Sequence, residues 1–166
     1  MEMTIINTPD KLKQYEKKLN GGLSRNVKTD ILVSMGTCGI AAGTTPVLDE
    51  LKKEVAEQNL QDSIRIIPVG CMGLCHSEPT LEVIDRDGGS SVIFGNVTAD
   101  KAKAIIAKTV RAAGVQPVAK TWYYPEEEEN KESALQARIV LRNCGRINPE
   151  SIDDYIARSG YQALAK

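Results

Sequence analysis

Two short apolar runs each lead into a turn that contains glycine and cysteine. Residues 30–34 (DILVS) precede Cys38, and residues 63–69 (SIRIIPV) precede Cys71 and Cys75. Runs of Ile, Leu and Val without strict polar alternation are typical of strands that are buried on both faces of a sheet. A sheet of this kind must be covered by helices, so the pattern favours an α/β fold with three cysteines at its strand ends.

The other periodic segments complete this fold. Thr8-Pro9 opens a short leading helix that stops at Gly21-Gly22, and helical spacing of apolar residues predicts helices over 44–59 and 98–114. Two β-type runs, 80–84 and 91–94, are joined by a glycine-containing turn that predicts a hairpin. The order β-α-β-β-β-α is typical of thioredoxin-like folds. A ferredoxin-like α+β sandwich can be assembled from the same elements.

The chain changes character after Gly114. Residues 116–133 contain two prolines, the aromatic cluster Trp122-Tyr123-Tyr124 and four consecutive glutamates, 126–129. We interpret this stretch as a linker or arm with a solvated acidic surface. The aromatic cluster is interpreted either as a docking contact for a neighbouring surface or as local packing.

A tail follows, and it completes the domain division. Alternation over 135–141 precedes a helix that opens at Asn148-Pro149 and stops at Gly160, and residues 161–166 begin a further helical pattern. The tail is therefore interpreted as the front of something longer. The predicted division is a leading helical segment (1–28), an α/β domain (29–115), a linker (116–133) and an incomplete further unit (134–166).

Charge and the first residues limit the classes of function. A formal net charge of −1, with no basic stripe, argues against a nucleic-acid partner. The start MEMTIIN has neither a basic region nor an apolar stretch of signal-peptide length, so we expect a cytoplasmic protein without membrane insertion. In a reducing compartment, cysteines favour a metal or redox role over disulfides.

Cys38, Cys71 and Cys75 are the candidate site. Two short glycine-rich turns that face each other could bind an iron–sulfur cluster, because thiolates must reach it from both sides. A structural zinc site would use the same three residues with His76. A thiol-dependent redox protein would use Cys38, with Cys71 or Cys75 resolving its disulfide, and inert buried thiols are the remaining alternative.

Three stretches carry a family resemblance: GTCGIAAGTTPVLDELKKE, GCMGLCHSEPTLEV and FGNVTADKAKAII. They resemble the thioredoxin-like 2Fe-2S ferredoxin domain that precedes the flavoprotein core in some NADH dehydrogenase subunits. The tail RIVLRNCGRINPESIDDYIARSGYQALAK is similar to the segment that opens that core. The core belongs to the NADH-binding (complex I 51 kDa-like) subunit of NADH dehydrogenases and of NAD-linked, electron-bifurcating hydrogenases and formate dehydrogenases.

The resemblance implies an electron-transfer module of a multisubunit NADH-dependent oxidoreductase. It implies a 2Fe-2S cluster on Cys38, Cys71 and Cys75, with other subunits of an iron–sulfur flavoprotein complex as partners. FMN, NAD and a 4Fe-4S centre would lie in a further part of the chain or in partner subunits, because residues 1–166 contain no expected NADH or FMN catalytic site. A cluster-free scaffold that docks subunits is the alternative from a different class.

The chain departs from the family in its first turn. Members place two cysteines there with the spacing C-x4-C, whereas Ser34 and Gly39 occupy these places here and Cys38 is shifted by one residue. The fourth ligand therefore stays open among Ser34, Thr37, His76 and water. Cys144 would complete the set if the tail folds back over the domain, and otherwise it is expected to be a small buried residue.

Overall fold

A computed structural model describes residues 5–21, 27–89, 91–111 and 139–165. The predictions for the linker 116–133, with its aromatic cluster 122–124 and its acidic run, lie outside these residues. The same holds for the C-terminal end of the helix predicted over 98–114 and for the first part of the tail.

The centre of the fold is a four-stranded sheet of order β2-β1-β3-β4. Strand β1 pairs with β2 in parallel and with β3 antiparallel, and β3 pairs with β4 antiparallel. This mixed α/β topology confirms the thioredoxin-like fold class that the element order predicts. The strands are β1 (Thr29–Ser34), β2 (Ile64–Val69), β3 (Leu81–Asp85) and β4 (Ser91–Phe94).

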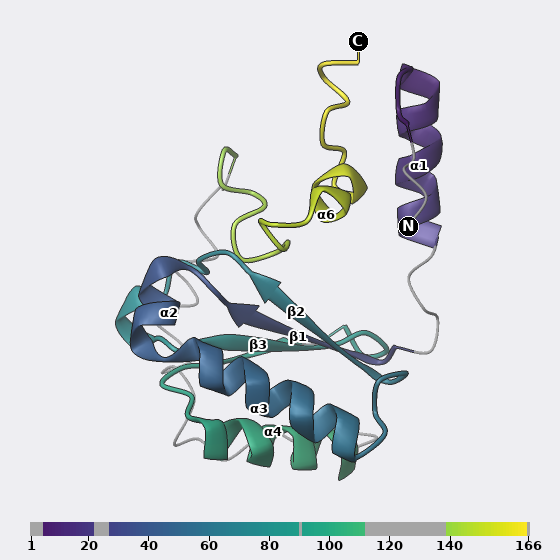
Figure 1. Ribbon diagram of the computed structural model, residues 1–166. Coiled ribbons are helices and arrows are strands. Elements are labelled where there is room, and N and C mark those ends of the chain that lie inside the picture. The colour runs from purple at the N-terminus through teal and green to yellow at the C-terminus, as the bar shows by residue number, and fades with distance from the viewer. Residues whose placement is uncertain (1–4, 22–26, 90, 112–138, 166) are drawn as a thin grey trace.

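Helices α3 (Thr44–Glu57) and α4 (Ala99–Arg111) lie side by side on one face of the sheet (Figure 1). Their apolar stripes meet the side chains of alternate strand residues, as the pleat requires. Leu51 of α3 is 0 % exposed and Ile105 of α4 is 1 % exposed. Each such side chain contributes about 1.5–3 kcal/mol by leaving water, so this layer provides the main core.

The opposite face of the sheet carries a smaller apolar cluster of Leu32, Val69 and Met72. Asp30 lies on the same face and accepts two hydrogen bonds of 2.8 Å from Arg65, its neighbour across the strand pair. Figure 1 shows the C-terminal segment on this side of the sheet. The sheet is therefore covered by helices on one face and partly by the tail on the other.

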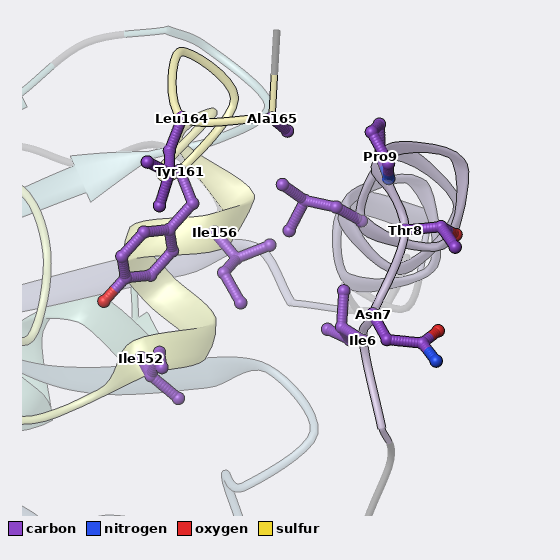
Figure 2. A pocket seen from close by; sticks show the side chains of 10 residues that line it. Ile6, Asn7, Thr8, Pro9, Ile152, Ile156, Tyr161, Leu164 and Ala165 are labelled. Atoms are coloured by element: carbon purple, nitrogen blue, oxygen red, sulfur yellow. The ribbon is translucent and has the colours of Figure 1, made fainter.

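The leading helix α1 (Pro9–Gly21) packs against α6 (Ile152–Ala157), although the two are far apart in the sequence. The Tyr15 hydroxyl donates to Asp153 over 3.0 Å, and the Asn20 amide donates to the Ala157 carbonyl over 3.2 Å. Between α1 and the tail lies a groove of about 570 Å³ (Figure 2). Its apolar walls include Leu12, Ile156 and Leu164.

Three predictions about elements need correction. A separate short helix, α2 (Thr37–Ala42), precedes α3, and Gly43 between them adopts a φ of +97°. The last helix is shorter than predicted, because Ser151 caps it by accepting a hydrogen bond from the Asp154 N–H. Residues 161–165 form turns in place of the predicted helical pattern; left-handed φ values at Ser159 and Tyr161 interrupt the helix.

Within the residues described, we find no helix with the length and apolar character that crossing a membrane requires.

Candidate functional site

Cys71 and Cys75 lie in the turn that leaves β2, and their side chains meet. The two Sγ atoms are 3.6 Å apart. The Gly73 N–H donates to the Cys71 Sγ over 3.3 Å, and Gly73 has a φ of +88°, a conformation that glycine adopts without a steric penalty. A 3₁₀ turn, η1 (Cys75–Ser77), then carries Cys75 and His76 on the exposed side of the loop.

The separation of the pair suits one tetrahedral metal ion. Two thiolates on such an ion, with metal–sulfur bonds of about 2.3 Å, lie about 3.8 Å apart. The 3.6 Å between Cys71 and Cys75 is close to this value. Soft thiolates are the ligands of iron–sulfur clusters and of structural zinc, so the donor set fits either group at this half of the site.

The turn after β1 lies directly against this pair. A Cβ added at Gly36 would be 3.1 Å from the Cys71 Cβ, and the Met35 N–H donates to the Val69 carbonyl over 2.7 Å. A side chain at Gly36 would require its neighbour to move by a few tenths of an ångström, so glycine suits this close approach. Cys38 follows two residues later in α2 and is exposed. The sheet therefore brings the two predicted cysteine turns together.

Gly39 has no room for a side chain. A Cβ at this position would be 2.6 Å from the Ser34 carbonyl oxygen and 3.0 Å from the Thr44 Oγ1. A cysteine at the second place of the family spacing would therefore collide with the backbone. At the first place, Ser34 is fully buried and its hydroxyl donates to Glu78 Oε1 over 2.7 Å.

The C-terminal segment reaches the same site, as the Cys144 hypothesis requires. A Cβ at Gly145 would lie 3.1 Å from the Cα of Met72, the residue after Cys71. The Arg146 guanidinium donates to Glu82 Oε2 of β3 over 2.8 Å. Cys144 is thus held beside the Cys71 turn, and it is exposed, so the expectation of a small buried residue is wrong.

Complete convergence of the thiols is not seen. In the part of the chain that the structure describes, no three His, Cys, Asp or Glu side chains form a group that could hold a metal ion. Cys71 and Cys75 meet, whereas Cys38, His76 and Cys144 lie on adjoining backbone without forming such a group. The ligand set therefore stays a prediction.

Electrostatics favour the thiol form of Cys71 when no metal is bound. The hydrogen bond from the Gly73 N–H lowers the pKa of Cys71, but the opposing effects are together larger. Burial, the contact with Cys75 and the charge of Glu78 raise the pKa above its ordinary value of 9.0. A metal ion would have to displace the proton, so cluster binding is expected to release protons.

Sequence reasoning missed Glu78. This carboxyl group is 8 % exposed and accepts from Ser34, from the Thr80 N–H at 2.7 Å and from the Thr80 hydroxyl at 3.0 Å. The segment SEPT, directly after Cys75 and His76, carried the only available signal, a charged residue before a strand.

The chain is similar in sequence to two subunits of one hydrogenase. The chain is 34% identical over 107 residues to the NADP-reducing hydrogenase subunit HndB of Solidesulfovibrio fructosivorans, which covers 64% of this chain and 83% of that subunit. It is also 71% identical over 31 residues to subunit HndC of the same organism, only 6% of that protein and 19% of this chain. No family model matches.

Solved structures of the thioredoxin-like [2Fe-2S] ferredoxin from Aquifex aeolicus resemble the chain. One matches with a TM-score of 0.46 at 21% identity, over 55% of this chain and 92% of the ferredoxin. Another matches with a TM-score of 0.47 at 22% identity, over 55% and 86%. The sequence match to HndB shows the family of this chain, because it spans 83% of that subunit's length. The chain belongs to the family of the NADP-reducing hydrogenase subunit HndB.

Proposed function

We propose that this protein is an electron-transfer subunit of a multisubunit, hydrogenase-type oxidoreductase. The observation that carries the proposal is the Cys71–Cys75 pair, 3.6 Å apart and in contact with the Gly36 turn. Membership of a family that contains a hydrogenase subunit supports the multisubunit setting. The finer assignment, to an NADH-linked flavoprotein complex, rests on the resemblance of the tail.

We infer that Cys38, Cys71 and Cys75 bind a 2Fe-2S cluster and that Cys144 supplies the fourth thiolate. The packing of Gly145 on the Cys71 turn supports the last ligand, because Cys144 is the residue before Gly145 and a Cβ at Gly145 would lie 3.5 Å from the Cys71 carbonyl oxygen. Such a cluster, when bound, takes up and releases one electron. The chain's own residues hold the thiolates, and the Gly73 N–H donates to one of them.

Iron and acid-labile sulfide per chain, with an electron paramagnetic resonance spectrum of the reduced protein, test the proposal on anaerobically purified material. We expect two irons and two sulfides per chain. Cys71→Ser should lose most of both. Absence of iron from the wild-type protein would contradict an electron-transfer role, and one zinc per chain without visible absorption would assign a structural zinc site instead.

The fourth ligand is tested separately with Cys144→Ser and His76→Ala. Loss or alteration of the cluster spectrum in Cys144→Ser, with little change in His76→Ala, is the expected result. The reverse pattern would transfer the role to His76. An unchanged spectrum in both variants would leave Ser34, Thr37 or water as the ligand.

A cluster-free scaffold is the second candidate. It is favoured by the lack of a complete ligand group among the described residues. In this case the protein would act through its packing surfaces. These are the contact of α1 with α6 and the packing of Gly145 on the Cys71 turn. Metal analysis separates the two candidates.

We also propose that the domain division 1–28, 29–115, 116–133 and 134–166 holds for the whole protein. A stretch of 31 residues is 71% identical to HndC, and this match supports a segment that recurs in another subunit. Expression of residues 27–111 alone tests whether the α/β domain folds without the segments that precede and follow it in the chain.

A further inference from the structure

Glu78 places a carboxyl group in the interior between the two cysteine turns. It directly follows η1, and its Oε1 accepts from Ser34, the last residue of β1. Its Oε2 accepts from the N–H and the hydroxyl of Thr80. Burying a carboxyl group is costly unless donors surround it, and here three neutral donors do so. The contacts join the end of β1 to the end of the second turn.

The carboxyl group also lies close to the backbone of the candidate ligands. Its Oε2 would be 3.2 Å from a Cβ at Gly39, the residue after Cys38. The Thr80 hydroxyl that donates to Glu78 also lies 3.9 Å from the sulfur of Met72, the residue after Cys71. Cys75 precedes Glu78 by three residues. Glu78 therefore lies near the residues that follow Cys38 and Cys71, and it follows Cys75 closely in the chain.

A negative charge at this place would act on a redox centre held by the turns. Reduction adds one electron to such a centre, and a nearby negative charge in a poorly hydrated environment disfavours this addition. Salt screens buried charges far less than exposed ones.

We propose that Glu78 is a positioning residue that joins the two cysteine turns and whose charge lowers the reduction potential of the centre they bind. The inference rests on the proposed function. The step it concerns is the uptake of one electron by the centre, without a bond or proton change at Glu78. The electron would come from one neighbouring redox centre of the complex and would pass to another.

The test is the reduction potential of the cluster in Glu78→Gln, measured by a dye-mediated titration followed by electron paramagnetic resonance. Glutamine keeps the shape: its oxygen can accept from Thr80, and its amide can donate to Ser34, since a hydroxyl also accepts. We expect a tenfold change in the reduced-to-oxidised ratio at a fixed potential. This corresponds to a rise in the reduction potential of about 59 mV for one electron.

Two matched variants separate charge from shape. Glu57→Gln removes an exposed carboxylate at the last residue of α3 and should leave the potential near that of the wild type. Glu78→Asp keeps the charge and should retain the low potential even where the melting temperature falls. If the single glutamine variant does not fold, Thr80→Val with Glu78→Gln removes the charge together with one of its hydroxyl donors and is measured in its place.

An unchanged potential in a cluster-containing Glu78→Gln protein would overturn the role of Glu78 and leave the proposed function standing. A rise of equal size in Glu78→Asp would also overturn it, because the charge is retained there. A wild-type protein without iron would instead overturn the proposed function, and the role of Glu78 would fall with it.

Discussion

Gly39 occupies a space that admits no side chain. The carbonyl oxygen of Ser34 faces it, and Thr44 donates its hydroxyl hydrogen to the Gly39 carbonyl over 2.8 Å. Backbone cannot yield as a flexible side chain can, so this contact excludes even a methyl group without movement of β1 or α2. This crowding explains why no side chain stands at Gly39, the second cysteine place of the family spacing.

Gly39→Ala is expected to destabilise the protein by about 1–3 kcal/mol, because overpacking of a buried site shifts its neighbours. Chemical denaturation followed by circular dichroism measures the change. Gly21→Ala is the control, since a Cβ there meets nothing within 4 Å and the residue lies in a helix. An equal effect of the two substitutions would show that the space around Gly39 is not decisive.

The elements at the two ends of the chain hold the tail in place. α6 packs on α1, and the segment before it packs on the second cysteine turn and on β3. The ion pair between Arg146 and Glu82 is central to this arrangement: the Glu82 side chain is 6% exposed, while that of Arg146 is 49% exposed. Because Glu82 is buried, it depends on Arg146 for a charged partner.

Arg146→Ala is expected to cost about 1–2 kcal/mol, a buried-pair value reduced because one partner is half-exposed. It should also make the tail more susceptible to limited proteolysis. Adding Glu82→Gln should recover part of the loss, since the buried charge is then gone. A double variant whose loss is the sum of the two single losses would contradict a coupling between these residues.

At the scale of the whole molecule, one face of the sheet depends on the packing of α3 against α4. Glu54 is buried in α3, and its Oε1 forms an ion pair of 2.8 Å with the Lys103 ammonium group of α4. This ion pair, with a hydrogen bond from Gln58, lowers the pKa of Glu54 below its ordinary value of 4.5. Glu54 in turn raises the pKa of Lys103 above its ordinary value of 10.5.

Stability should therefore depend on pH at both limits. Glu54 holds fewer protons in the folded than in the unfolded chain, so its contribution is present above about pH 4.5 and is lost as the pH falls through the folded pKa. The contribution of Lys103 is present below pH 10.5 and is lost as the pH rises through its raised pKa. The pair thus stabilises the protein throughout the neutral range.

Lys103→Met is expected to make the acid limb of the stability curve shallower, because it removes the main cause of the lowered pKa of Glu54. Urea denaturation at a series of pH values between about 3 and 7 measures this limb. Lys52→Met, which removes an exposed lysine of α3, is the control. Identical slopes in wild type and Lys103→Met would refute the assignment.

Sequence patterns predict the strands, the main helices and a thioredoxin-like α/β fold, with a ferredoxin-like sandwich as the alternative. Local patterns suffice there: apolar runs such as Ile31–Val33 are typical of a covered strand, and residues such as Leu51 recur at helical spacing. It also identified Cys71 and Cys75 as neighbours in one turn. These properties depend on residues that are close in the chain.

The contents of the site beyond that turn depend on tertiary contacts. The contact of Gly36 with Cys71, the seat of Gly145 on Met72 and the burial of Glu78 each join residues that are distant in sequence. The end of the last helix follows from the left-handed φ values of Ser159 and Tyr161, which the apolar pattern of the sequence does not reveal. Spacing along a chain cannot encode which backbone segments meet, because sheet pairing and packing bring them together.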